Sequence, residues 1–184
     1  MNRAQSEDRP MGDLIRLGTI AEVDLAGARC TVDLDDELTT DWVPWFAPRA
    51  GETAIWSPPS VGEQVLLISP EGDMESAVAL LGVYSDDNPA PGDSLTELIR
   101  FKDGAIISYD PEAHALSAIL PDGATAEITA PGGLTITGDV TIEGDVTING
   151  KAEASEDVVG GGISLKSHKH GGVAAGGAKT AVPE

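Results

Sequence analysis

Leu134–Gly150 reads LTITGDVTIEGDVTING, and the fold of the chain is decided by this stretch. Its even-numbered positions are all apolar or glycine, whereas its odd-numbered positions from Thr135 to Asn149 are all polar. The unit G-D-V-T-I-x begins at Gly138 and again at Gly144, so the repeat has a period of six. Strict alternation of apolar and polar residues is typical of a β-strand that buries one face. The stretch is therefore predicted to be extended, with one apolar stripe.

The stripe needs a hydrophobic partner, because an extended ribbon of this length, roughly 55 Å, cannot bury it alone. A β-solenoid of the hexapeptide acyltransferase type also repeats every six residues, but a solenoid needs several coils and this repeat is too short for them. A sheet edge packed on a barrel is disfavoured because the repeat is longer than such a barrel. An intertwined trimer is favoured, since three chains share one interior and leave no free sheet edge.

The amino-acid composition of the chain excludes several kinds of function. The 184-residue chain has a net charge of −20, 22 glycines, 12 prolines and only 4% aromatic residues. Glycine and proline at this level favour short strands and turns. The acidic balance argues against an OB-fold that binds single-stranded nucleic acid, which needs clustered Lys and Arg, and against attraction to an anionic membrane surface. No signal peptide or membrane span is recognisable, so a soluble product made in the cytoplasm is expected.

The first half of the chain predicts a small closed barrel. After an N-terminal arm, residues 1–16, short alternating segments are separated by Gly/Pro turns, which is typical of the five-stranded OB-fold. We expect this OB-fold domain to span residues 17–84 and to contain Cys30 as a small buried residue. A short helical turn is expected just before it, at Met11–Leu17. The expected strands are Gly18–Asp24, Arg29–Leu34, Asp41–Phe46, Glu63–Ser69 and Ser76–Tyr84.

The residue pattern of the second half of the chain differs from that of the first. A linker, residues 85–94 (SDDNPAPGDS), precedes the β-helix domain expected at 95–160, and a tip is expected at 161–184. Strand-sized segments precede the long repeat at Ile99–Phe101, Ala105–Tyr109, Ala115–Leu120 and Thr125–Thr129. The predicted fold class is therefore all-β: an N-terminal OB-fold barrel followed by an intertwined trimeric triple-stranded β-helix, or β-prism.

Two histidines near the C-terminus have the spacing of metal ligands. In an extended chain His168 and His170 face the same side. One chain supplies too few ligands, but a trimer brings six imidazoles to one axis. Zinc prefers four ligands, so a six-nitrogen site points to iron or nickel. Such a metal would be structural, because six protein ligands leave no position for a substrate.

No catalytic constellation is recognisable in the sequence, and the chain is not expected to be an enzyme. His114 has no ligand partner nearby in sequence and is interpreted as a surface or turn histidine. Asp139 and Asp145 recur beside glycines, and solvated carboxylates on the outer face of the trimer are favoured over a calcium site.

Taken together, these features resemble the baseplate assembly protein V family, the central spike of contractile-tailed phages and of R-type bacteriocins (pyocins). The residues that carry the resemblance are Trp56–Val65 (WSPPSVGEQV), Phe101–Asp110 (FKDGAIISYD), the GDVTIEGDVTING repeat and Ser167–Gly172 (SHKHGG). It covers the chain from about Leu17 to its end.

The resemblance implies a homotrimer whose OB-fold attaches to the tail hub of the baseplate. It also implies one iron ion per trimer, held at the tip by His168 and His170 of each chain. The implied function is mechanical: sheath contraction drives the spike through the outer membrane of the target cell. The protein would be made in the bacterial cytoplasm and assembled into a virion or a bacteriocin particle. The alternative is a hexapeptide-repeat acyltransferase-like solenoid.

Overall fold

A computed structural model describes residues 14–35, 38–169, 172 and 176, and the chain divides into two units, Met1–Glu127 and Ile128–Glu184. The expected all-β class is confirmed: helix among the described residues is limited to the short 3-10 turns η2 (Pro70–Gly72) and η3 (Met74–Ser76). Within those residues, no helix has the length and apolar character needed to cross a membrane.

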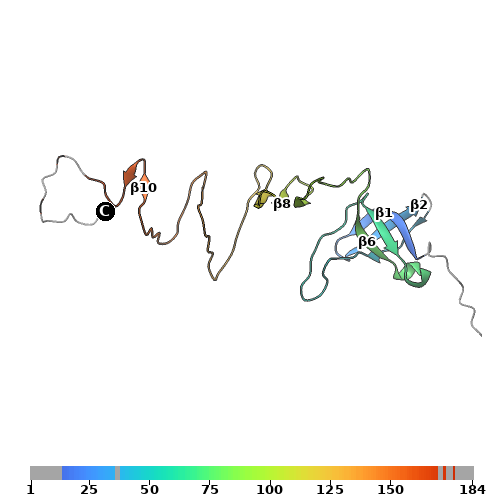
Figure 1. The fold of residues 1–184 in the computed structure, drawn as a ribbon. Coiled ribbons are helices and arrows are strands. Elements are labelled where there is room, and N and C mark those ends of the chain that lie inside the picture. The colour runs from blue at the N-terminus through green and yellow to red at the C-terminus, as the bar shows by residue number, and fades with distance from the viewer. Residues whose placement is uncertain (1–13, 36–37, 170–171, 173–175, 177–184) are drawn as a thin grey trace, which may run out of the picture. The chain divides into compact units, whose positions relative to one another are not determined.

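The first unit contains a barrel whose strands follow the expected order along the chain (Figure 1). Its sheet has the strand order β3-β2-β1-β5-β6, and β4 also pairs with β2. All pairings named for these strands are antiparallel. The strands are β1 (Ile15–Asp24), β2 (Arg29–Asp35), β3 (Leu38–Thr39), β4 (Val43–Pro44), β5 (Gln64–Ile68) and β6 (Val78–Val83).

The barrel closes through the residues directly after β4. Trp45 forms a parallel bridge with Ala79 of β6, and the Phe46 amide donates to the Ala79 carbonyl at 2.8 Å. Since β4 pairs with β2 on its other side, the ring runs β1-β2-β4-β6-β5 and returns to β1. This is a closed barrel of the five-stranded OB type, which leaves few unpaired strand edges.

Strand β1 belongs to both sides of the barrel because it bends in the middle. Its first half, Ile15–Thr19, pairs with β5, and its second half, Thr19–Asp24, pairs with β2. The register with β2 shifts between Ile20 and Glu22, which is the mark of a β-bulge, and bulges increase local bending and twist. Gly18 lies just before this bend, and a Cβ there would come within 2.5 Å of Val32 Cγ1 and 2.8 Å of the Asp33 carbonyl oxygen.

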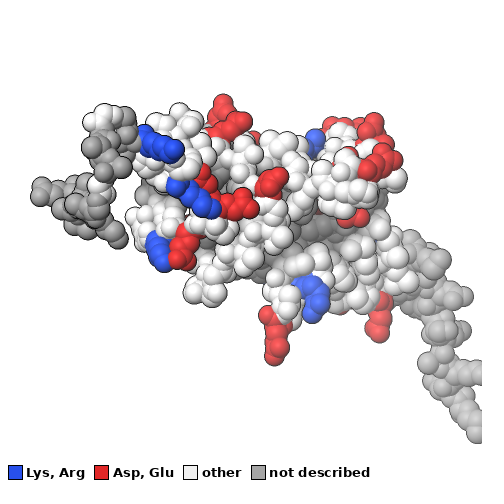
Figure 2. Space-filling model, turned by 60° about the vertical axis from the view of Figure 1, so that its left-hand side comes forward, with Lys and Arg blue, Asp and Glu red and all other residues white. Residues whose placement is uncertain are grey.

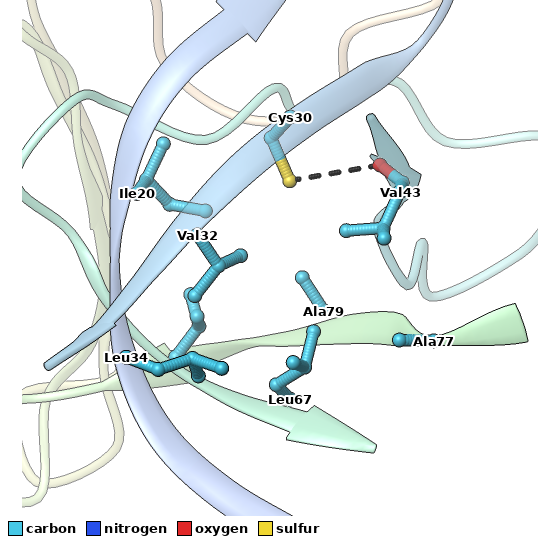
Figure 3. Close-up of a cluster of buried hydrophobic side chains, with 9 residues drawn as sticks. Ile20, Cys30, Val32, Leu34, Val43, Leu67, Ala77 and Ala79 are labelled. Carbon is cyan, nitrogen blue, oxygen red and sulfur yellow. Dashed lines mark hydrogen bonds between the residues drawn. The ribbon is translucent and has the colours of Figure 1, made fainter. Parts of the chain in front are cut away.

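The barrel core is small and aliphatic, as the low aromatic content requires. Figure 3 shows side chains from β1, β2, β4, β5 and β6 meeting around Val32. Cys30 is fully buried in this core, as expected, with its Sγ 3.8 Å from the Val43 carbonyl oxygen. Burial, with a smaller contribution from the Glu63 carboxylate, raises the pKa of the Cys30 thiol from 9.0 to about 11, so the thiol stays protonated at neutral pH. The core residues are Ile20, Cys30, Val32, Leu34, Val43, Val65, Leu67, Ala77 and Ala79.

Two local expectations are wrong. The short helical turn proposed for Met11–Leu17 is not formed at Ile15–Leu17, which begin β1 because their backbones pair with β5; residues 11–13 lie outside the described part. The strand expected at Thr125–Thr129 is absent, since no neighbouring strand of the same chain pairs with it.

A separate three-stranded antiparallel sheet follows the linker. Its order is β7-β8-β9, formed by Glu97–Arg100, Ile106–Asp110 and Ala115–Ile119. The β8–β9 turn is held by Asp110, whose Oδ1 accepts the amides of Glu112 and Ala113 at 2.8 and 3.1 Å. His114 completes this turn with a φ of +53° and is exposed, which confirms it as a turn histidine.

Replacing Gly18 by alanine is expected to destabilise the barrel by about 1–3 kcal/mol, because the added methyl group overpacks against Val32 and the β2 backbone. Gly51→Ala is the matched control, since a Cβ at Gly51 meets no atom within 4 Å. Tryptophan fluorescence during urea unfolding measures the effect, because all three tryptophans, Trp42, Trp45 and Trp56, lie in the barrel region. Equal unfolding midpoints for the two variants would contradict the close approach at Gly18.

Candidate functional site in the repeat and the C-terminal hairpin

The long repeat forms no strand pairing within its own chain. From Ile128 to Val158 the backbone contains no strand, and Figure 1 draws this part of the chain as coil without arrows. Its apolar side chains are between 59% and 65% exposed at the even positions. They are Leu134, Ile136, Val140, Ile142, Val146 and Ile148.

Exposure of this apolar stripe to water is unfavourable in free energy. Burying one aliphatic side chain completely is worth about 1.5–3 kcal/mol. The backbone groups of an extended segment also need partners, which one chain of the repeat does not provide. Both demands are met at once if the stripe faces identical stripes from other chains.

The glycines of the repeat mark regular changes in backbone direction. Gly138 and Gly144 have φ angles of +125° and +150°, a region that residues with a Cβ rarely adopt. A Cβ at either position would meet no atom within 4 Å, so the requirement for glycine is conformational rather than steric. The six-residue period of the sequence is therefore also a period of the backbone conformation.

Beyond the repeat, the chain forms a tight hairpin. Strands β10 (Val159–Gly160) and β11 (Ile163–Ser164) are antiparallel and are joined by Gly161 and Gly162. These glycines have φ angles of +57° and +84°, as a two-residue type I′ turn requires. A leucine or valine in either place would be strained, so the GGG run at 160–162 serves the turn.

Asp157 ties the open end of this hairpin together. Its Oδ1 accepts the backbone amide of Val158 at 2.8 Å and that of Lys166 at 3.0 Å. The Leu165 amide donates to the Val158 carbonyl at 2.9 Å, beside the same carboxylate. Hydrogen bonding, first from the Ser164 side chain and then from the Lys166 and Val158 amides, holds the pKa of Asp157 below its usual value. These hydrogen bonds stabilise the charged form of the carboxylate.

His168 is attached to the hairpin through Ser164. The His168 amide donates to the Ser164 carbonyl at 3.1 Å, and the His168 Nδ1 lies 3.0 Å from the same oxygen. A carbonyl oxygen only accepts hydrogen bonds, so the proton of the neutral ring lies on Nδ1 and the lone pair on Nε2. The His168 side chain is exposed and can be reached by ligands or by other chains.

The second expected metal ligand, His170, lies outside the described residues. Among the residues that the structure does describe, no group of three or more His, Cys, Asp or Glu side chains could hold a metal ion. The described part of one chain therefore does not form a metal site by itself. The exposed imidazole of His168 suits a site shared between chains, since imidazole is a common metal ligand.

Charge on the surface agrees with the acidic composition. Figure 2 shows Asp and Glu side chains spread over the drawn face, with fewer Lys and Arg and no broad basic patch on that face. Asp139 and Asp145 are exposed in the single chain, and their place on the outer face of the trimer stays a prediction.

Comparison with known proteins divides the chain into three matched regions. Residues 16–84 match the OB domain of type VI secretion system and phage-baseplate injectors. Residues 97–164 match the β-helical trimerization domain of Gp138, and residues 162–184 match the GpV apex motif. The resemblance to the central spikes of contractile tails is confirmed. None of these descriptions names a catalytic reaction.

A curated relative agrees with the domain matches. The spike protein of Escherichia phage P2 is 44% identical over 128 residues, which is 69% of this chain and 59% of the relative. The chain thus matches less than two thirds of that relative's length. Because the trimerization match includes the whole six-residue repeat, a trimeric β-helix is favoured over the acyltransferase-like solenoid.

The role of His168 and His170 as metal ligands stays a prediction, and the sequence did not predict the hairpin that carries His168. A Gly-Gly pair between two short apolar segments, Val158–Val159 and Ile163, is the available signal for this hairpin. The roles of Asp157 and Ser164 could not be predicted, because they depend on contacts across the turn.

Substitution of Ile142 by asparagine is expected to abolish or weaken association of the chains, because it places a polar amide in the stripe that needs burial. Glu143→Gln is the matched control on the adjacent odd position, which faces away from the stripe in an extended chain. Size-exclusion chromatography with light scattering measures the assembly state. The burial hypothesis fails if Ile142→Asn assembles as tightly as Glu143→Gln.

Proposed function

We propose that three copies of this chain form the spike at the tip of a contractile tail, which pierces the outer membrane of the target cell when the sheath contracts. The observation that carries the proposal is the order of the matched regions: an injector OB domain, a β-helical trimerization domain and an apex motif follow one another in one chain. The spike protein of phage P2 supports the same function.

Trimer formation gives the repeat the mechanical properties that such a spike needs. Hydrogen bonds between chains would have to break together before the shaft could splay, and a closed trimer has no free edge. The six exposed aliphatic side chains of each repeat would form the shared interior. A shaft of this kind transmits force along its axis without any catalytic group, and we propose that the protein is not an enzyme.

At the apex, we propose one structural iron ion per trimer, held by His168 and His170 of each chain. The support is the ligand chemistry: two imidazoles separated by one residue, with His168 exposed and hydrogen-bonded through Nδ1 to the β10–β11 hairpin. When bound, the ion would supply a cross-link between three chain ends, where fraying otherwise begins.

The OB domain would attach the spike to hub proteins of the tail baseplate. Its surface supports a protein partner rather than a nucleic acid, because it exposes large apolar side chains such as Phe46, Trp56 and Leu80 while the chain carries a net charge of −20. We propose that the protein is made in the bacterial cytoplasm and is then built into a phage or bacteriocin particle.

Location in the particle tests the spike function directly. Gold-labelled antibodies raised against the purified chain are expected to bind at the distal end of the tail in electron micrographs of intact particles. Antibodies against a sheath protein serve as the control and are expected to label the tail along its length. Labelling of this chain at the capsid or along the sheath would overturn the proposal.

Metal content tests the apex. The purified chain is expected to contain about one iron per three chains by elemental analysis, and His168→Ala/His170→Ala is expected to lose it, because each chain then offers no imidazole at the apex. His114→Ala is the matched control, since His114 is an exposed histidine in the β8–β9 turn. Iron that survives the double substitution would contradict the assignment of the ligands.

A further inference from the structure

We propose that Asp157 is a positioning residue for the apex metal: by bracing the hairpin that carries Ser164, it orients His168 so that Nε2 is the ligating atom. The proposal rests on the proposed function, which assigns His168 to the metal.

The first step is the bracing of the hairpin by one carboxylate. Asp157 Oδ1 accepts an amide on each side of the turn, from Val158 at 2.8 Å and from Lys166 at 3.0 Å. Bonds from a charged acceptor are stronger than neutral ones, so this residue holds a two-residue strand pair that would be marginal alone.

The second step passes from Ser164 to the histidine. The Ser164 carbonyl accepts both the amide and the Nδ1–H of His168, at 3.1 and 3.0 Å. The Ser164 Oγ lies 3.0 Å from the Ser167 amide and 2.9 Å from the Ser167 Oγ, which fixes the segment between them. The ring is thereby held at two points, its backbone and its Nδ1.

The third step concerns the proton on the ring. A neutral histidine in water carries its proton mainly on Nε2, whereas the hydrogen bond to the Ser164 carbonyl requires the proton on Nδ1. The hairpin therefore selects the tautomer whose Nε2 lone pair can bind a metal. Carbonyl groups that hold the second nitrogen of a metal-binding histidine are common outer partners, and losing them typically lowers metal affinity about 10–100-fold.

The experiment uses the full chain in three variants. Asp157→Ala removes the acceptor, Asp157→Asn keeps a carbonyl oxygen that can accept the same amides, and Glu156→Ala removes a neighbouring exposed acid as the matched control. Light scattering first establishes that each variant assembles like the wild type. Selective ¹⁵N-histidine labelling then reports the ring tautomer of His168 in metal-free protein, and transfer of iron to a chelator reports the dissociation rate.

Wild-type protein and Glu156→Ala are expected to show the Nδ1–H tautomer and slow loss of iron. Asp157→Ala is expected to shift His168 toward the Nε2–H tautomer and to lose iron about 10–100-fold faster, while Asp157→Asn restores most of both properties. A wild-type chain with normal iron but an Nε2–H tautomer overturns the positioning role alone. A wild-type chain that takes up no iron overturns the metal assignment, and this proposal falls with it.

Discussion

Burial of one apolar stripe is the constraint on which the rest of the molecule depends. The even-numbered side chains of Leu134–Gly150 are exposed in a single chain, and the backbone that carries them has no strand partner there. Burial of these side chains and hydrogen bonding of this backbone each contribute a large free energy. Three parallel copies of the chain would provide both. The trimerization domain matched at residues 97–164 agrees with that solution.

The two units of the chain differ in whether they form a hydrophobic core within one chain. The barrel is self-sufficient: Trp45 and Phe46 join β4 to β6, and the ring encloses a core of small aliphatic residues. The repeat has no interior of its own. A chain that joins a self-contained domain to an incomplete one is well suited to a part that attaches at one end and assembles at the other.

The hairpin near the C-terminus carries His168, which we propose as a metal ligand. Gly161 and Gly162 allow the tight turn, and Asp157 braces its open end. His168 follows at once, with its ring hydrogen-bonded to the Ser164 carbonyl. An exposed histidine on a flexible tail would sample many orientations, and ordering it would cost conformational entropy each time a metal bound. If His168 binds the proposed apex metal, these local hydrogen bonds would reduce that cost.

Much of the protein could be read from its sequence, because its decisive signals are local and periodic. Alternation in the repeat predicted an extended apolar stripe, Gly/Pro turns predicted the barrel, and the pair His168 and His170 was visible from spacing alone. Long-range contacts decided the rest. Residues Ile15–Leu17 became a strand because β5 lies beside them, and Thr125–Thr129 did not, because the chain offers no neighbour. Only the folded hairpin reveals Asp157 and Ser164, since hydrogen bonds across a turn leave no periodic trace in the sequence.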